Sequence, residues 1–319
     1  MTQPGLRASE HGTTPSGRAP RVWFVTGASR GLGRAIAEVA LEAGETVVAT
    51  ARGPEALAPL VERFGERVLP MALDVTDRAA VFAAVAEAAE RTGRIDVVLN
   101  NAGYGLAGAV EEVGEQQVRD QFDVNLFGAL WVTQAVLPVM RRQGGGHLLQ
   151  MSSIAGVTTY PNLGLYCASK WALEALSEAL AQEVAGFGIK VTLVEAGEFR
   201  TEWSAGSMVR ATPKAAYDEV LARRRHGLSG AYAHLQPGDP RRSGEALLKL
   251  LDADEPPLRV LLGNGAADLA PRVLGDRLAE WERWDALART TDFPADFPAD
   301  VTPEATPGAT PEITPDQQP

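Results

Sequence analysis

VWFVTGASRGLG, residues 22–33, carries the strongest structural signal in the chain. Its first residues are apolar, aromatic or β-branched, which is typical of a buried strand. The sequence that follows, RAIAEVALEAG, has the apolar spacing of a helix that ends at Gly44. Glycines at 27, 31 and 33 would let the backbone approach a pyrophosphate, which the free N–H groups and positive dipole end of the helix attract. A glycine turn between a strand and a helix therefore predicts a dinucleotide-binding unit.

The alternation of strand and helix continues along the chain. Seven strands are predicted from apolar segments at 22–27, 45–52, 67–75, 95–103, 145–153, 190–197 and 258–263. Most are separated by segments of helical periodicity with short connections, which is typical of a parallel, doubly wound sheet. We predict an α/β fold of Rossmann type, a doubly wound parallel seven-stranded sheet with helices on both faces. Its ligand crevice should lie at the carboxyl ends of the strands.

The two ends of the chain differ in composition from the region between them. Residues 1–20 are polar and predict a disordered leader. Proline recurs every four or five residues through 291–319, which predicts an extended, acidic, disordered tail that is either inert or binds a partner. The region 21–290 is expected to form one catalytic domain, closed by a helix at 265–290. Its irregular part, about 198–238, reads as a lid without sheet.

Charge and cysteine content exclude several functions. The formal net charge is −11, and the tail holds six acidic residues and no basic ones, which leaves −5 for the rest. Such a balance argues against nucleic acid or an anionic membrane as a partner. The single cysteine, Cys167, excludes an intrachain disulfide and a cysteine metal cluster, and it reads as a packed residue rather than a nucleophile. With no apolar signal segment and no run of membrane length, we expect a cytoplasmic protein without a metal.

The segment SIAGVTTYPNLGLYCASK ends with Tyr166 and Lys170, four residues apart. The residues that follow have helical periodicity, so the two side chains should share one helix face. There the ammonium could stabilise a tyrosinate, although lowering a phenol pKa from about 10 toward 7 needs roughly 4 kcal/mol. Such a tyrosine could exchange a proton near neutral pH. The alternative is a surface Tyr and Lys that share a helix by accident.

Three other polar residues stand where the predicted crevice would lie. Arg52 ends the second strand, where an NAD-binding protein usually offers an acid to the ribose 2′-hydroxyl, and a cation there suits a 2′-phosphate. Asp74 ends the third strand and would either reach the adenine or cap the helix that begins near Asp77. Asn125 lies inside a helical segment, where asparagine is unfavourable and calls for a specific reason.

Together TGASRGLG, NNAG, FDVNLFG, YCASK and the run from Gly197 to Thr201 resemble the short-chain dehydrogenases/reductases, in the single-domain branch with TGxxxGxG and YxxxK motifs. The resemblance covers about residues 21–265 and implies an NAD(P)-dependent oxidoreductase, a carbonyl reductase or alcohol dehydrogenase. It implies that Ser153 holds the substrate oxygen and Tyr166 exchanges its proton. Lys170 would lower the Tyr166 pKa and hold the nicotinamide ribose, and Asn125 would position a water.

The resemblance also implies a set of cofactor contacts. The glycine loop would meet the pyrophosphate or the adjacent ribose, Asp74 and Val75 the adenine, and Thr201 the carboxamide. The whole set is Gly27, Ser29, Arg30, Gly31, Leu32, Gly33, Arg52, Asp74, Val75, Asn101, Ala102, Gly103, Tyr166, Lys170, Gly197 and Thr201. Because of Arg52, NADP (NADPH) is the expected cofactor, with NAD possible. Ala196 stands where the family usually has proline, which should loosen that turn.

Two other functions and two partner expectations remain. A dinucleotide-sensing regulator without turnover, or a Rossmann epimerase or dehydratase, would use the same fold. The expected substrate is a small-molecule carbonyl or alcohol, and a hydrophobic one if the following residues line its pocket rather than pack the lid: Tyr104, Val157, Tyr160, Leu163, Phe199, Trp203, Met208 and Tyr217. The apolar faces of the helices at 115–142 and 165–185 predict a homodimer or homotetramer.

Overall fold

A computed structural model of the chain describes residues 19–293. The predicted leader and tail lie outside these residues, apart from 19–20 and 291–293. The chain divides into two compact units, one ending at Leu274 and one beginning at Gly275. The sequence placed this boundary at about 290 instead. Everything that forms the sheet and the site belongs to the first unit.

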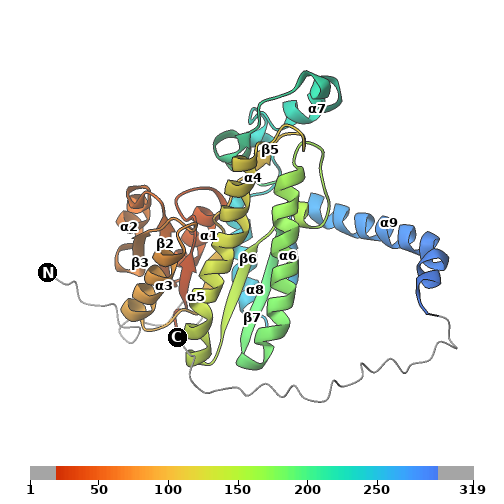
Figure 1. Cartoon of the computed structure of the whole chain (residues 1–319). Coiled ribbons are helices and arrows are strands. Elements are labelled where there is room, and N and C mark those ends of the chain that lie inside the picture. Colours follow the sequence, from red (N-terminus) through yellow and green to blue (C-terminus); the bar gives the residue numbers. More distant parts are fainter. Residues whose placement is uncertain (1–18, 294–319) are drawn as a thin grey trace, which may run out of the picture. The chain divides into compact units, whose positions relative to one another are not determined.

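Seven parallel strands form one sheet, in the order β3-β2-β1-β4-β6-β7-β9 (Figure 1). Their bounds are Val22–Val25 (β1), Thr46–Ala51 (β2), Val68–Ala72 (β3), Val97–Asn100 (β4), Gly146–Met151 (β6), Ile189–Ala196 (β7) and Arg259–Leu262 (β9). Each neighbouring pair is parallel. The doubly wound sheet of seven strands is therefore confirmed, and all seven predicted segments supply a strand.

Helices cover both faces of the sheet, as Figure 1 shows. The helices of the first unit are Gly31–Glu42 (α1), Ala58–Phe64 (α2), Arg78–Thr92 (α3), Glu115–Phe122 (α4), Gly128–Gln143 (α5), Gly164–Val184 (α6), Asp218–Gly227 (α7) and Pro240–Leu251 (α8). One apolar core joins the sheet to α3, α5 and α6, through Val81, Val132 and Leu180 among others. A second core joins the other face to α1 and α8, through Ile36 and Leu247. Burying both faces is what fixes a fully apolar parallel sheet.

The helical run Glu115–Gln143 is interrupted by a π-helical turn, η3, at Asp123–Phe127. By length and composition this run is apolar enough to cross a membrane, with a mean hydropathy of 1.3, and 33% of its most apolar stretch is buried. The expectation that no segment meets this test is therefore corrected. The core helix of a soluble protein meets the same test, and α5 places Val132, Val136 and Met140 in the core beneath the sheet. The observation is thus weak evidence for a membrane.

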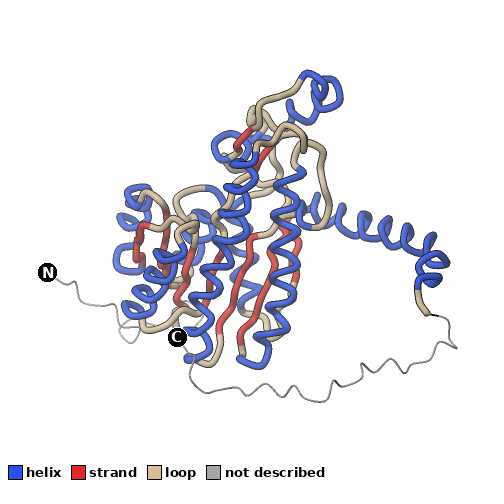
Figure 2. Tube along the Cα trace, in the orientation of Figure 1, coloured by secondary structure: helices blue, strands red, loops and turns tan. Residues whose placement is uncertain are grey.

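The lid contains a small sheet that the sequence did not predict. Strand β5 (Leu106–Ala107) pairs in parallel with β8 (Val209–Arg210), visible in Figure 2 as short strand segments. Their backbone bonds, Val209 N to Gly105 O and Ala211 N to Ala107 O, are both 2.8 Å long. Two-residue strands have no alternating pattern, so the expectation of a lid without sheet was wrong for a physical reason. This sheet ties the lid to the loop that follows β4.

Helix α9 (Asn264–Ala288) matches the helix predicted at 265–290, but only its beginning is buried. Ala266 and Ala270 pack with Ile154 and Val157 in a small apolar cluster. Beyond Leu274 the helix belongs to the second unit, where Leu278, Trp281, Trp284 and Leu287 are exposed. The sequence predicted that the whole helix closes the domain, whereas its part beyond Leu274 is assigned to the second unit.

Candidate active site

A cavity of about 1040 Å³ lies at the carboxyl ends of the strands. Its wall combines the glycine loop, the ends of β2, β3, β4, β6 and β7, the start of α6, and the lid. Every residue of the predicted cofactor set lines it except Gly33, and Ser153, Tyr166 and Lys170 of the predicted catalytic set line it too. Asn125 does not. The topology thus gathers residues from positions 27 to 201 at one edge of the sheet.

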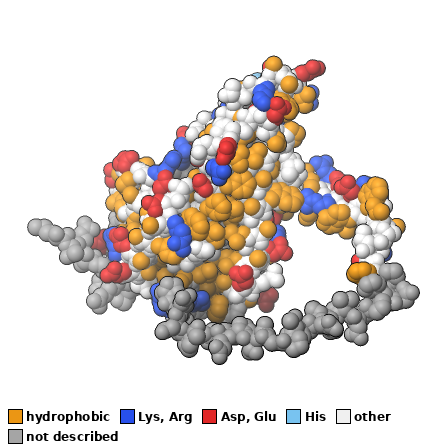
Figure 3. Space-filling model, viewed as in Figure 1, with side chains coloured by type: hydrophobic (Ala, Val, Ile, Leu, Met, Phe, Trp, Pro, Cys, Tyr) orange, Lys and Arg blue, Asp and Glu red, His pale blue; other side chains and the backbone are white. Residues whose placement is uncertain are grey.

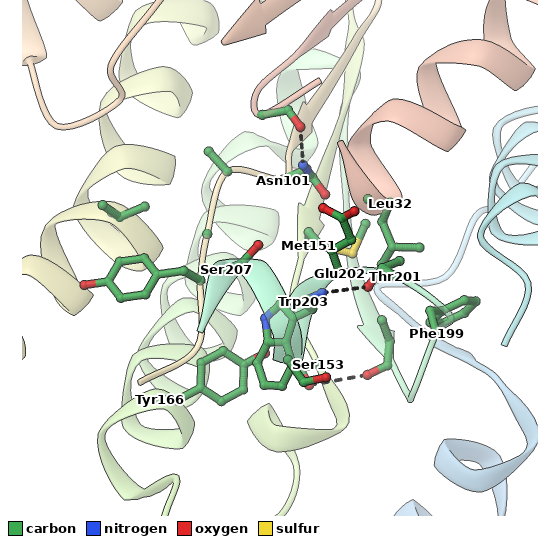
Figure 4. Close-up of a pocket in the computed structure, with 18 of the residues that line it drawn as sticks. Leu32, Asn101, Met151, Ser153, Tyr166, Phe199, Thr201, Glu202, Trp203 and Ser207 are labelled. Atoms are coloured by element: carbon green, nitrogen blue, oxygen red, sulfur yellow. Dashed lines mark hydrogen bonds between the residues drawn. The ribbon is translucent and has the colours of Figure 1, made fainter. Parts of the chain in front are cut away.

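The glycine loop packs closely against the backbone and side chains around it. Gly33 takes part in this packing although it does not line the cavity. A Cβ at Gly33 would lie 2.3 Å from Asn101 Nδ2 and 2.5 Å from the carbonyl oxygen of Gly27, so no other residue fits. Gly27 itself has a φ of +66°, which favours glycine. Asn101 Nδ2 donates to the carbonyl oxygens of Thr26 and Gly27 at 3.0 and 3.1 Å. Asn101, predicted to contact the adenosine side, therefore also fixes the loop to β4 (Figure 4).

The N-terminus of α1 is suited to a phosphate group. Its N-cap residue, Arg30, makes no side-chain capping hydrogen bond, and the first turn holds no acidic residue. The backbone N–H groups at this end therefore keep their capacity for an anion, and the helix dipole favours one. Gly31 has a φ of +60°, and its Cβ position meets only Thr201 within 4 Å. The loop thus fits a dinucleotide pyrophosphate by its own geometry.

The rim of the cavity near β2 and β3 carries the residues expected at the adenosine. Arg30 and Arg52 are both exposed, and neither forms an ion pair with any residue that the structure describes. Asp74 Oδ1 accepts from the backbone N and Oγ1 of Thr76, at 3.0 and 2.8 Å. The N-cap of α3 is Asp77, whose Oδ1 accepts from Ala80 N at 2.9 Å. Asp74 therefore does not cap α3. Its other predicted role, contact with the adenine, stays a prediction.

Ser153, Tyr166 and Lys170 meet at the inner end of the cavity. Ser153 follows β6, and its hydroxyl donates to Ala196 O at 3.3 Å and accepts from Ala155 N at 3.1 Å. Tyr166 lies on the first turn of α6 and is 7% exposed. Lys170 stands one turn further on, and its Nζ donates to Met151 O at 2.7 Å. Figure 4 shows Tyr166 and Ser153 close together, with Trp203 of the lid beside them.

The charges at this end differ from the sequence expectation. Burial raises the pKa of Tyr166 to about 12, and a hydrogen bond with Ser153 opposes the rise only in part. Burial lowers the pKa of Lys170 to about 8, against the attraction of the Glu174 carboxylate. The causes that shift the Tyr166 pKa here therefore differ from the sequence expectation, in which the Lys170 ammonium lowers it. A phenol whose pKa is raised keeps its proton, and the protonated form is the one that a general acid requires.

Asn125 acts through the backbone around it. Its Oδ1 accepts from Tyr104 N at 3.0 Å, and its Nδ2 donates to Tyr104 O at 3.0 Å and Ser169 Oγ at 3.1 Å. The side chain is 1% exposed and lies in the π-helical turn η3. It thereby joins the loop after β4 to α6, which explains an asparagine inside a helix. The water implied by the family resemblance stays a prediction.

The turn after β7, where Ala196 stands in place of the family's usual proline, is hydrogen-bonded to its neighbours. Gly197 N donates to Leu262 O of β9 at 2.9 Å, and Ala196 O accepts from Ser153. Thr201 follows, with its backbone N bonded to Phe199 O at 2.8 Å. These hydrogen bonds tie the turn to β9 and to Ser153, and the looser turn expected from the missing proline stays a prediction.

A cluster of two buried carboxylates and one exposed arginine lies behind Lys170 and was missed from the sequence. Glu174 on α6 and Glu195 on β7 both face Arg259 of β9, whose Nε lies 3.2 and 3.5 Å from their carboxylate oxygens. Burial raises the pKa of both carboxyls, that of Glu195 to about 7, with Glu174 adding to the rise and Arg259 opposing it. The cluster clamps α6, and with it Tyr166, to β7 and β9. The two glutamates and the arginine are far apart in sequence, so no local pattern reveals it.

The substrate side of the cavity agrees with the sequence only in part. Of the predicted lining residues, Tyr104, Tyr160, Leu163, Phe199 and Trp203 do line it, whereas Val157, Met208 and Tyr217 do not. The Trp203 ring lies 5.3 Å from that of Tyr166. The lid also contributes polar residues that sequence reasoning missed, among them Glu202, Arg224, Tyr232 and Gln236. Because the lid has no periodic pattern, no signal in the sequence indicated which of its residues face inward.

Known proteins share this fold and sequence. The model of the short chain dehydrogenase family matches residues 21–209. Oxidoreductase BOA17 of Botryotinia fuckeliana is 44% identical over 272 residues, which cover 84% of this chain and 98% of that protein. A short-chain dehydrogenase structure from Streptomyces avermitilis is 42% identical, with a TM-score of 0.81 over 86% of this chain and 99% of that one.

A second solved structure adds a bound dinucleotide. The short-chain dehydrogenase of Burkholderia cenocepacia, in complex with NADP, is 28% identical with a TM-score of 0.65, over 83% of this chain and 97% of the other. The chain belongs to the short-chain dehydrogenase/reductase family of NAD(P)-binding oxidoreductases.

Proposed function

We propose that the protein is a carbonyl reductase or alcohol dehydrogenase that prefers NADP. It would move a hydride between the nicotinamide and a carbonyl or secondary alcohol, with Tyr166 as the general acid or base. The observation that carries this proposal is the placement of the buried Tyr166 phenol beside the Ser153 hydroxyl in the cavity at the strand ends. Each hydroxyl could donate one hydrogen bond to a substrate oxygen, Ser153 by giving up its bond to Ala196 O.

The residues of the chain would divide the work as follows. The Ser153 hydroxyl holds the substrate oxygen, and Tyr166 gives it a proton as negative charge develops there, which is where fixed donors have their largest effect. Lys170, held by Met151 O, would bind the nicotinamide ribose through its ammonium. The backbone N–H groups at the start of α1 hold the pyrophosphate. The bound cofactor supplies the hydride chemistry, and the protein supplies orientation and electrostatics.

Two other functions are less well supported. A dinucleotide-sensing regulator needs the cofactor cradle but has no use for a phenol and a hydroxyl aimed at a second ligand. A Rossmann epimerase or dehydratase would be expected to add a substrate domain. The first unit instead covers its cavity with the short lid between β7 and α8.

The test is a screen of ketones and alcohols with NADPH and NADP⁺ that follows the absorbance of the reduced nicotinamide. We expect substrate-dependent oxidation of NADPH with at least one ketone and the reverse reaction with its alcohol. A reaction that lacks substrate but contains protein and NADPH is the control. Tight cofactor binding without turnover of any carbonyl or alcohol would favour the regulator.

We also propose that the protein is a homodimer or homotetramer. Figure 3 shows hydrophobic side chains gathered over the face where α4, α5 and α6 lie. Phe127, at the junction of η3 and α5, is 38% exposed there and stacks on Trp131, with ring centroids 6.0 Å apart. Covering such a face is a common reason for association. Light scattering at micromolar concentration should return a multiple of 33.9 kDa, and the mass of one chain would contradict the proposal.

A further inference from the structure

Arg224 is a cation on the wall of the substrate cavity. It lies on α7 in the lid and lines the same cavity as Ser153 and Tyr166. Its guanidinium carbon is 4.6 Å from the centre of the Tyr160 ring, which also lines the cavity. Stacking on an aromatic face holds a guanidinium in place and leaves its edge available for hydrogen bonds.

The guanidinium has no counter-charge among the residues that the structure describes. Its Nε is buried and has no hydrogen-bond partner there, and no carboxylate of those residues lies within 4 Å to form an ion pair. The next residue shows the contrast, because Arg225 bonds to Asp218 at 2.7 Å and pairs with Glu112. A buried donor without a partner is costly, so a group that satisfies Arg224 would gain correspondingly.

Much of the wall that Arg224 shares is apolar or aromatic, beside polar residues such as Tyr232 and Gln236. Tyr160, Trp203 and Leu228 pack in one apolar cluster with Tyr166, and all of them line the cavity. Glu198 and Glu202 line it too, but neither is within ion-pair distance of Arg224. An occupant with an apolar body against the rings and one anionic group at the guanidinium would complement this part of the cavity.

We propose that Arg224 binds a carboxylate of the substrate, so that the preferred substrates are carbonyl compounds with an apolar body and a carboxylate at the far end from the reacting carbonyl. This rests on the proposed reductase function. The planar guanidinium matches a carboxylate with two parallel hydrogen bonds, a geometry that a neutral ester or amide cannot reproduce. The expectation of a purely hydrophobic substrate is refined accordingly, because the apolar wall has one charged anchor.

The test compares a keto acid with its methyl ester, matched in chain length, on the unmutated protein and on Arg224→Gln. We expect Arg224→Gln to raise KM for the acid about tenfold to a hundredfold, with kcat nearly unchanged, because the anchor binds ground and transition states alike. KM for the ester should stay within about twofold. Arg223→Gln is the matched control, since Arg223 is the exposed neighbour on the same helix and does not line the cavity. Arg224→Lys keeps the charge, so its KM for the acid should lie between those of the unmutated protein and Arg224→Gln.

Binding separates this inference from the reductase proposal. Calorimetry on the NADPH-saturated protein, with the saturated acid that lacks the carbonyl, should show an affinity that falls about tenfold or more in Arg224→Gln. If no carbonyl is reduced but this affinity depends on Arg224, the reductase proposal fails and the carboxylate site stands. Equal KM for acid and ester on the unmutated protein, or stronger binding of a matched phosphonate, would overturn the carboxylate assignment. Melting curves of the variants exclude misfolding, and Arg224→Lys decides the matter if Arg224→Gln does not fold.

Discussion

Replacement of Tyr166 by phenylalanine is expected to lower turnover by about 10²–10⁴, the range typical of general acid catalysis. The change removes only the phenol oxygen and leaves a ring that packs with Ala155, Leu163 and Cys167. Folding and the cofactor cradle should therefore be preserved. Initial rates of NADPH oxidation with saturating ketone measure the loss of turnover. Titration with NADPH measures whether the affinity for the cofactor is preserved.

Tyr160→Phe is the matched control for this variant. Tyr160 also lines the cavity and also belongs to the apolar cluster around Tyr166, but no proton transfer is assigned to it. Loss of its hydroxyl should change turnover by about tenfold at most, since removal of one neutral hydrogen bond costs roughly 0.5–1.5 kcal/mol and about 1.4 kcal/mol corresponds to tenfold. Near-normal turnover in Tyr166→Phe, with both variants alike, would end the assignment of Tyr166 as the proton donor.

The pH profile of the unmutated protein provides a second measure of the same assignment. Because the pKa of Tyr166 is raised to about 12, the phenol keeps its proton across the working range and does not limit reduction. Lys170 has a pKa of about 8, so it carries its charge below that pH and loses it above. The reductive kcat/KM should therefore be flat at neutral pH and fall as pH rises past about 8. A profile that stays flat to pH 10 would show that the Lys170 charge is not needed.

The fold could be predicted from the sequence because its determinants are local. Each strand is a short apolar run, and most connections carry the periodic pattern of a helix. The glycines mark places where the backbone is closely packed, as at Gly33, which leaves no room for a side chain beside Asn101. Parallel strands then bring their carboxyl ends to one edge, so Ser153 and Tyr166 were expected in one crevice. The order of the strands along the chain and their parallel direction were enough to predict that these two residues share the site.

What the sequence could not give depends on burial and on packing across long sequence separations. The high pKa of Tyr166 follows from how completely the first turn of α6 is covered, which no spacing rule reports. The clamp of Glu174 on Arg259 joins residues 85 positions apart. Arg224 lies in a lid without periodicity, so its inward direction became visible only in three dimensions. The exposure of Trp281, on the part of α9 beyond Leu274, was likewise not indicated by the helical pattern.

The preference for NADPH over NADH should amount to at least about a hundredfold in kcat/KM. Arg30 and Arg52 stand on the rim of the cavity beside the ends of the glycine loop and β2, and no acidic residue occupies positions 50–53. A guanidinium can meet a 2′-phosphate with paired, charge-assisted hydrogen bonds, each contributing about 1.5–3 kcal/mol. Two arginines would give roughly two to four orders of magnitude, at about 1.4 kcal/mol per tenfold. Both are exposed, so water and salt screen them, and the lower end is expected.

Exchange of the rim charges tests this preference directly. Arg52→Leu should cut kcat/KM with NADPH at least tenfold and leave that with NADH nearly unchanged, because only the phosphate contact is lost. Adding Ala51→Asp should reverse the preference by offering a carboxylate to a free 2′-hydroxyl. Ala51 is only 6% exposed, so the double variant is first checked by its melting curve, and the single variant decides if the double one does not fold.

Arg142→Leu, an exposed arginine on α5 that does not line the cavity, is the control for surface charge. Because the phosphate contact is electrostatic, the preference should also shrink as ionic strength rises. Equal use of NADH and NADPH by the unmutated protein at low salt would show that the two arginines are merely solvated.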